Sequence, residues 1–237
     1  MSRRYFVDAP ISGDSAQLTG PEAHHLLHVM RAKPGDEVVL FDGSGDEFPA
    51  RIERLGRSEV ALAVLERETV DRELPGQLTL AVALPKGDRQ RWLVEKAVEL
   101  GVSRLVPLET ERSVAQPNAK ALDRLRRAVI EASKQCGRNR LMEIVPAQPW
   151  SEFLATTDSA QRLIAHPTGG ISSVDVPFSH TEPIVVAVGP EGGFSDAEVT
   201  AAMNHSWQAI VLGQRILRIE TAALALAAAI VAQLERP

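Results

Sequence analysis

From residue 78 onward, short apolar runs alternate with segments of helical character, and this alternation constrains the fold more than any other feature. Runs such as LTLAVAL (78–84) and IVVAVGP (184–190) are typical of strands buried on both faces. The pattern predicts an α/β domain with a mainly parallel sheet and helices on both faces. The expected strands are 78–84, 103–110, 143–147, 162–167, 184–190 and 209–213, and the expected helices are 88–101, 119–136, 195–205 and 220–234.

The first 70 or so residues follow a different pattern. Three short β-rich segments, at 36–43, 47–56 and 58–69, are separated by turn signals such as PGD and DGSGD. They indicate a small antiparallel β-barrel, preceded by a short helix in which Pro21 suits the first turn. We expect two domains, 1–72 and 73–237.

Composition restricts the cellular compartment in which the protein is expected. The longest strongly apolar run, TAALALAAAIVAQL (221–234), is too short for a membrane span, and MSRRYFVDAP at the N-terminus has no signal-peptide core. Cys136 is the single cysteine, so no intrachain disulfide is possible and we expect a cytoplasmic protein. The formal net charge of -5 argues against a chain that is basic all over.

The charge is unevenly distributed. Residues 111–140 carry eight basic side chains and three acidic ones, most of them on the expected helix near 119–136. Two interpretations stay open for this helix. Its arginines form either an ordinary solvated face or a surface that contacts the phosphate backbone of RNA.

Two loops after expected strands have the composition of a ligand site. The glycine loop, GPEGGFS (189–195), lacks the lysine of a phosphate-binding loop and the spacing of a dinucleotide fingerprint. Ser195 and Glu198 have the spacing of a capping box, so a helix should start there. In the arginine loop, GQRILRIE (213–220), two arginines flank an apolar pair.

Ligands bind such sheets outside the carboxyl ends of the strands, so these two loops should meet. Together they offer backbone N–H groups, apolar cover and a cation. An adenosyl group with a sulfonium tail suits this combination, whereas a triphosphate without a lysine cradle does not. A simple glycine turn without a ligand is the alternative.

These residues resemble a known family. GPEGGFSDAE and LGQRILRIETAALALA are similar to the signature loops of the RsmE family, the 16S ribosomal RNA (uracil-N3)-methyltransferases. The similarity continues upstream in HHLLHVMRAKPGDEVVLFDG, in KGDRQRWLVEKAVELGVSRLVPLETERSV and in EASKQCGRNR. It covers nearly the whole chain in order.

The resemblance implies a PUA-like β-barrel at residues 1–72, for RNA binding, and a SPOUT-type methyltransferase domain with a C-terminal trefoil knot at 73–237. It also implies S-adenosylmethionine as cofactor, a homodimer, and a uridine of 16S rRNA in the small ribosomal subunit as substrate. Separately, His24, His25 and His28 have no cysteine or further clustered carboxylate to complete a metal site, so we expect no metal. Gln214 and Ile219 stand where the family more often has proline and threonine. The cofactor residues carried over are Ala165, His166, Gly189, Pro190, Glu191, Gly192, Gly193, Leu212, Gly213, Ile216, Leu217 and Arg218.

Methylation at uracil N3 requires loss of the N3 proton and stabilisation of the resulting anion. We assign Arg218 an electrostatic role toward the uracil oxygens, and Glu220 or Glu191 the role of base or orienting group. Each has a structural alternative. Glu220 could instead stabilise the positive end of the last helix. Glu191 could accept backbone N–H bonds within its own loop. Arg218 could lie at the surface or at a dimer interface.

The candidate RNA contacts combine the basic helix with polar residues of the N-terminal module. They are Arg3, Arg4, His25, Arg31, Arg112, Arg127, Lys134 and Arg138. Two other functions remain possible at this level: a related knotted methyltransferase with a different RNA target, and a non-catalytic RNA-binding ribosome-assembly factor.

Overall fold

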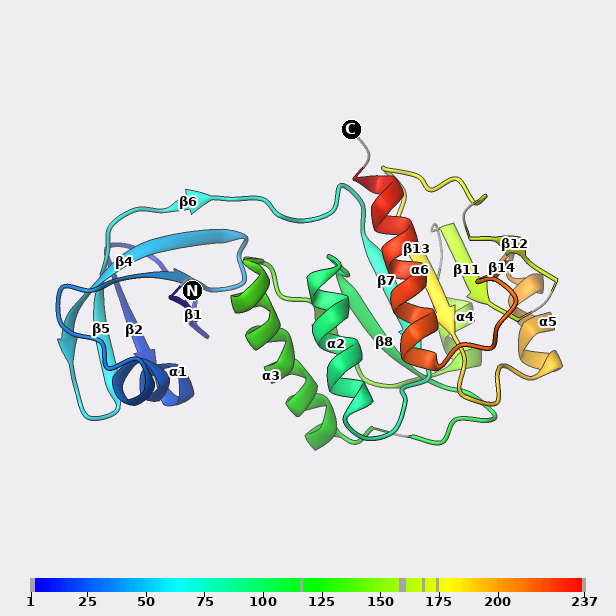
Figure 1. Ribbon diagram of the computed structural model, residues 1–237, viewed down its shortest axis with the longest axis horizontal. Helices are drawn as coiled ribbons and strands as arrows, with labels where there is room; N and C mark the ends of the chain where they lie inside the picture. The colour runs from blue at the N-terminus through cyan, green and yellow to red at the C-terminus, as the bar shows by residue number, and fades with distance from the viewer. Residues whose placement is uncertain (1–2, 116, 158–160, 168, 174, 236–237) are drawn as a thin grey trace. The chain divides into compact units, whose positions relative to one another are not determined.

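The computed structural model in Figure 1 describes residues 3–115, 117–157, 161–167, 169–173 and 175–235. The chain forms two compact units. The N-terminal unit is Met1–Glu73 together with Ser133–Leu141, and the α/β unit is Leu74–Ala132 together with Met142–Pro237. The end of the expected basic helix and the segment after it thus group with the N-terminal unit.

The N-terminal unit contains one six-stranded sheet with the order β1-β3-β4-β5-β2, and β6 pairs with β4. Neighbouring strands are antiparallel except for β1 and β3, which run parallel. The strands are β1 (Arg4–Phe6), β2 (Ser15–Thr19), β3 (Glu37–Phe41), β4 (Asp46–Leu55), β5 (Glu59–Val64) and β6 (Glu68–Thr69). The sequence pattern predicted β3, β4 and a single segment, 58–69, that the structure divides into β5 and β6. It missed β1 and β2, because RYF and SAQLT are short and carry little apolar alternation.

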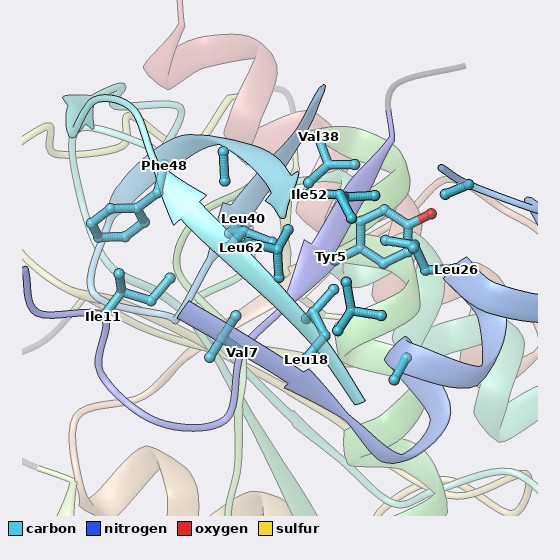
Figure 2. Close-up of a cluster of buried hydrophobic side chains, with 14 residues drawn as sticks. Tyr5, Val7, Ile11, Leu18, Leu26, Val38, Leu40, Phe48, Ile52 and Leu62 are labelled. Carbon is cyan, nitrogen blue, oxygen red and sulfur yellow. The ribbon is translucent and has the colours of Figure 1, made fainter. Parts of the chain in front are cut away.

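Figure 2 shows the core of this unit, in which alternate residues of the strands point to one face. Leu40 of β3, Ile52 of β4 and Leu62 of β5 are almost completely buried and belong to the same cluster as Tyr5. Leu26 closes the cluster from the helical segment between β2 and β3. Burial of each such apolar side chain contributes roughly 1.5–3 kcal/mol.

The helical segment consists of α1 (Gly20–His24), with proline in its first turn as expected, and a π-helical turn, η1 (His25–Val29). Arg31, two residues beyond η1, has a φ of 49°, which is uncommon for a residue with a side chain.

The α/β unit is built on an eight-stranded sheet with the order β10-β8-β7-β13-β11-β14-β12, and β9 pairs with β8. Every pair is parallel, as the apolar strands predicted. The strands are β7 (Leu78–Val82), β8 (Arg104–Glu109), β9 (Glu143–Ile144), β10 (Gln148–Pro149), β11 (Gln161–Ala165), β12 (Ile171–Ser172), β13 (Ile184–Val188) and β14 (Gln208–Val211).

Helices cover both faces of this sheet (Figure 1). On one face α6 packs on β7, β13 and α2, and on the other α4 packs against α5. Val185 and Ala187 of β13 join Trp150 in the cluster under α4 and α5. The helices are α2 (Arg89–Glu99), α3 (Ala119–Cys136), α4 (Trp150–Thr156), α5 (Asp196–Asn204) and α6 (Ile219–Leu234).

Among the described residues, no helix combines the length and apolar character that a bilayer span requires. The threading of the chain through a trefoil knot stays a prediction of the family resemblance.

Candidate functional site

The glycine loop follows β13 directly. Gly193 has a φ of +68°, in the left-handed region, and its N–H donates to the Pro190 carbonyl over 2.8 Å. A Cβ atom on Gly189 would lie 2.9 Å from the Phe194 ring, so only glycine fits there without a shift. The predicted capping box is present at the end of the loop: Glu198 Oε2 accepts from the Ser195 N–H at 2.8 Å, and the Ser195 hydroxyl accepts from the Glu198 N–H.

The arginine loop lies between β14 and α6. Gly213 has a φ of +71°, which lets the chain turn sharply after Leu212. Arg218 is the N-cap residue of α6, and its carbonyl accepts from the Ala222 N–H at 2.9 Å. Its side chain makes no capping bond to the helix and is exposed.

A third segment completes the site after β11. This strand lies between β13 and β14 in register with both, so three neighbouring parallel strands end at the same edge of the sheet. The His166 N–H donates to the Ile210 carbonyl at 3.0 Å and fixes the path of the chain after Ala165. The two loops therefore meet as predicted, and the segment 165–167 joins them.

The three segments enclose a cavity of about 390 Å³, within the size range of small-molecule sites. Of the predicted cofactor residues, all except Arg218 line it. Those lining residues are Ala165, His166, Gly189, Pro190, Glu191, Gly192, Gly193, Leu212, Gly213, Ile216 and Leu217.

The cavity also has lining residues that the sequence pattern did not assign to it. Their common signal is position, because they directly flank the predicted loops or the ends of the neighbouring strands. They are Pro167, Val188, Phe194, Asp196, Ile210, Arg215, Ile219 and Ala222, together with Arg112, which was predicted only as an RNA contact.

Arg112 comes from the segment after β8 and braces the glycine loop. Its guanidinium Nη1 donates to the Gly192 carbonyl over 2.8 Å. A Cβ on Gly192 would lie 3.2 Å from Arg112 Cδ, so the arginine packs closely against the loop. Beside it, the Glu111 N–H donates to Glu198 Oε1 at 2.8 Å, which ties the same segment to the start of α5.

The candidate catalytic carboxylates share one cation. Arg89, in the first turn of α2, places Nη2 at 3.4 Å from Glu191 Oε1 and Nη1 at 3.6 Å from Glu220 Oε1. The Glu220 side chain is 8% exposed, and its second oxygen, Oε2, is buried with no hydrogen-bond partner among the described residues. Glu191 lines the cavity, whereas Glu220 and Arg218 are not part of its lining.

The lining combines four kinds of group. Apolar side chains such as Val188, Phe194 and Leu217 can cover a flat ring, and the glycine loop offers backbone polar groups. Glu191 and Asp196 provide negative charge, and Arg112 and Arg215 provide positive charge. The arrangement suits an amphipathic ligand with an aromatic ring and charged groups of both signs.

Several predicted RNA contacts hold the N-terminal unit together instead. Arg4 is buried, and its guanidinium donates to Glu47 at 2.6 Å and to the Asn139 side chain. Arg138 is also buried and donates two hydrogen bonds to Glu73. Because these guanidinium groups are enclosed by their own partners, the geometry argues against the predicted RNA contact for both.

Glu47 shows the strength of this network. Burial alone would raise the pKa of its carboxyl group, but the hydrogen bonds from Arg4 and Arg72 outweigh that effect and hold the pKa below its usual value. Lys134 is largely buried as well, and its ammonium lies 2.9 Å from Glu22.

The remaining RNA candidates are exposed. Arg3 pairs with Asp36 at 3.2 Å, and His25 and Arg31 lie on and just after η1. Arg127 is exposed on α3 in the α/β unit. A metal site is not built by the nearby His24 and His28, because the described residues contain no group of three potential ligands.

The chain combines a parallel sheet that carries a three-segment cavity with a small β unit, and both parts match families of RNA methyltransferases. Residues 72–231 match the RNA methyltransferase domain family, and residues 18–65 match the RNA methyltransferase PUA domain. The chain belongs to the family of ribosomal RNA small subunit methyltransferase E, abbreviated RsmE.

Relatives and solved structures agree on this family. The chain is 33% identical to ribosomal RNA small subunit methyltransferase E of Synechocystis, over 92% of this chain and 73% of the relative. It is 28% identical to the Bacillus subtilis protein of that name, over 98% and 97% of the two chains. A crystal structure of ribosomal RNA small subunit methyltransferase E from Neisseria gonorrhoeae, bound to S-adenosyl methionine, is similar with a TM-score of 0.89, 33% identity and coverage of 97% and 96%.

Proposed function

We propose that this protein transfers the methyl group of S-adenosylmethionine to N3 of a specific uridine in 16S rRNA of the small ribosomal subunit. The observation that carries the proposal is the cavity at the carboxyl ends of β11, β13 and β14, in a chain that belongs to the RsmE family. Membership in this family favours rRNA methylation over another RNA target or a purely structural role in ribosome assembly.

The residues of the cavity fit the methyl donor. Val188, Ile210 and Leu217 suit the adenine ring, and Gly189 and Gly192 leave room where a Cβ would meet Phe194 or Arg112. When bound, S-adenosylmethionine supplies a methyl group that is already activated by the sulfonium charge. The chain then has to bind the donor and the uracil base, orient them toward each other, and remove the proton from N3.

We assign Glu191 as the carboxylate closest to the reaction, because it lines the cavity and is 40% exposed on its side chain. It is the candidate that accepts or orients the N3 proton. Glu220 is assigned a positioning role, since it is buried behind Arg89 and does not line the cavity. Arg218, exposed at the start of α6, is assigned to the uracil oxygens, where its charge would stabilise the anion.

We also propose that the protein acts as a homodimer in the cytoplasm. Ile216 supports this, because it lines the cavity and is yet 91% exposed in the single chain. An apolar side chain this exposed beside a ligand site is suited to cover by a second copy.

The direct test is transfer of labelled methyl groups to small subunits from a strain that lacks the modification, with free rRNA as a second substrate. Mass spectrometry should locate the product at N3 of one uridine. Arg218→Ala should abolish transfer while circular dichroism and affinity for the donor persist. Near-normal turnover would refute its role, and absence of donor binding in calorimetry of the wild-type protein would favour a non-catalytic factor.

A further inference from the structure

A second cavity lies in the α/β unit, between the first turns of α2 and α3. This α2–α3 groove has a volume of about 680 Å³ and shares no lining residue with the cavity described above. Its apolar lining comes from α3, where Leu125 and Ala128 are buried. Its charged lining includes Arg124 and Arg127, which are exposed.

These two arginines differ from the others nearby. Arg126 donates to Asp123 at 2.8 Å and to the Ile144 carbonyl, and Arg91, which also lines the groove, donates to Glu95 at 2.6 Å. Arg124 and Arg127 form no ion pair or hydrogen bond through their guanidinium groups within the described part of the chain. They are therefore available to a ligand.

The groove also contains two acidic residues, Asp88 and Glu131. Arg91 faces both of them. The pKa of its guanidinium is raised, mainly by the hydrogen bond and charge of Glu95 and to a smaller extent by the charges of Glu131 and Asp88. Arg91 is itself paired with Glu95, so the lining holds three arginines against two acids, and Arg124 and Arg127 are the ones with no partner among the described residues.

One helix end reinforces this positive charge. The first turn of α3 has no acidic residue, and Ala121 of that turn lines the groove. The partial positive charge of this N-terminus adds to that of the arginines, whereas Asp88, the N-cap residue of α2, balances the corresponding charge of α2.

The groove is next to the methyl-donor site. The first turn of α2 separates the two, because Arg89 contacts Glu191 and Glu220 while Gln90 and Arg91 line the groove. An extended polymer in the groove would pass directly beside the cavity.

We propose that the α2–α3 groove binds the sugar-phosphate backbone of the rRNA substrate next to the target uridine, with Arg124 and Arg127 contacting phosphates. The inference rests on the proposed function and names the surface that presents its substrate. Charge complementarity carries it, since two uncommitted arginines and the N-terminus of α3 match a polyanion.

The test uses the full-length protein and small ribosomal subunits that lack the methyl mark. Arg124→Gln, Arg127→Gln and the double variant are compared with Arg104→Gln, which removes an exposed arginine at the opposite end of β8. Binding to subunits is measured over a salt series, KM and kcat are measured for methyl transfer, and donor affinity is measured by calorimetry.

We expect the double variant to raise KM for subunits about tenfold or more. The logarithm of the association constant for subunits falls as the logarithm of the salt concentration rises. The magnitude of this slope should decrease by about 1.5, as for two lost phosphate contacts. Donor affinity should stay unchanged, and Arg104→Gln should behave like the wild type.

An unchanged KM and salt slope in the double variant would overturn the inference. A second result would also overturn it. If the double variant sediments as a monomer, yet each protomer binds small ribosomal subunits as tightly as the wild type does, the groove serves as the contact with a second copy of the chain. If the wild type binds subunits but transfers no methyl group, the proposed function fails, while the binding and salt-slope measurements still decide whether the groove contacts RNA.

Discussion

Arg89 and Glu220 connect the start of α2 to the start of α6, with Nη1 and Oε1 3.6 Å apart. The same guanidinium reaches Glu191 at 3.4 Å, so one arginine links the glycine loop to the helix that follows the arginine loop. Glu220 is 8% exposed, so the ion pair with Arg89 offsets part of the cost of burying its carboxyl group. The two loops of the cavity are thereby held in a fixed relation by a residue that does not line it.

Arg89→Ala should lower both stability and activity. The buried Glu220 would lose its cation, which we expect to cost the α/β unit about 1–3 kcal/mol, given that Arg89 is 34% exposed. Methyl transfer should fall by about tenfold or more, because the glycine loop would lose its link to α6. Denaturant unfolding and single-turnover kinetics measure the two effects.

The matched control for Arg89 is Arg104→Ala, since Arg104 forms an exposed pair with Glu143. That change should cost at most about 1 kcal/mol. In a double-mutant cycle, Arg89→Ala with Glu220→Gln should give a coupling free energy above about 0.5 kcal/mol. Additive effects would show that the pair is not coupled.

Gly189→Ala should weaken donor binding without unfolding the protein. The added Cβ would lie 2.9 Å from the Phe194 ring and would push the ring or the loop out of place. Calorimetry with S-adenosylmethionine should show affinity lowered by about tenfold or more. Gly87→Ala provides a comparison, because its Cβ would meet no atom within 4 Å, although its φ of +66° adds backbone strain. Equal affinity in both variants would contradict a close fit at Gly189.

The sequence predicted most of this site because its chemistry lies in two continuous loops. Apolar strands mark where each loop begins, and glycine spacing with a capping box marks the glycine loop. What it could not predict depends on contacts between distant residues. Arg112 and Gly192 are 80 positions apart, and Arg89 and Glu191 are 102 apart.

The same limit explains the errors on RNA contacts. Arg4 and Arg138 have the composition of a basic surface, but their partners Glu47 and Glu73 lie 43 and 65 positions away. Local charge counts could not separate such enclosed arginines from free ones such as Arg127. Likewise α4 was missed, because its seven residues are too few for a helical period to appear.

Glu47→Gln should destabilise the N-terminal unit and change its acid sensitivity. The lowered pKa of Glu47 means that its carboxylate contributes stability above the ordinary carboxyl pKa, and this contribution is lost as pH falls through the lower folded value. The variant leaves the buried Arg4 without its anion, at a cost of roughly 3 kcal/mol near neutral pH. Its stability should then vary less with pH in the acid range.

Hydrogen exchange at peptides from β3 and β4 measures this effect in the full chain. Glu37→Gln is the control, because Glu37 pairs with Arg51 on the surface, with 63% of its side chain exposed. It should cost at most about 1 kcal/mol and leave the acid response as in the wild type. An acid response in Glu47→Gln equal to that of the wild type would exclude Glu47 as its source.

Ile216→Asp should weaken self-association. Ile216 is 91% exposed in the single chain, and burial of such a side chain contributes roughly 1.5–3 kcal/mol per copy, twice over in a symmetric dimer. Sedimentation should therefore show the dimer dissociating at a protein concentration at least about tenfold higher than for the wild type. Val29→Asp is the matched control, since Val29 is 61% exposed on the N-terminal unit. If both variants associate as the wild type does while Ile216→Asp alone loses donor affinity, Ile216 serves the cavity of its own chain and the partner makes no contact there.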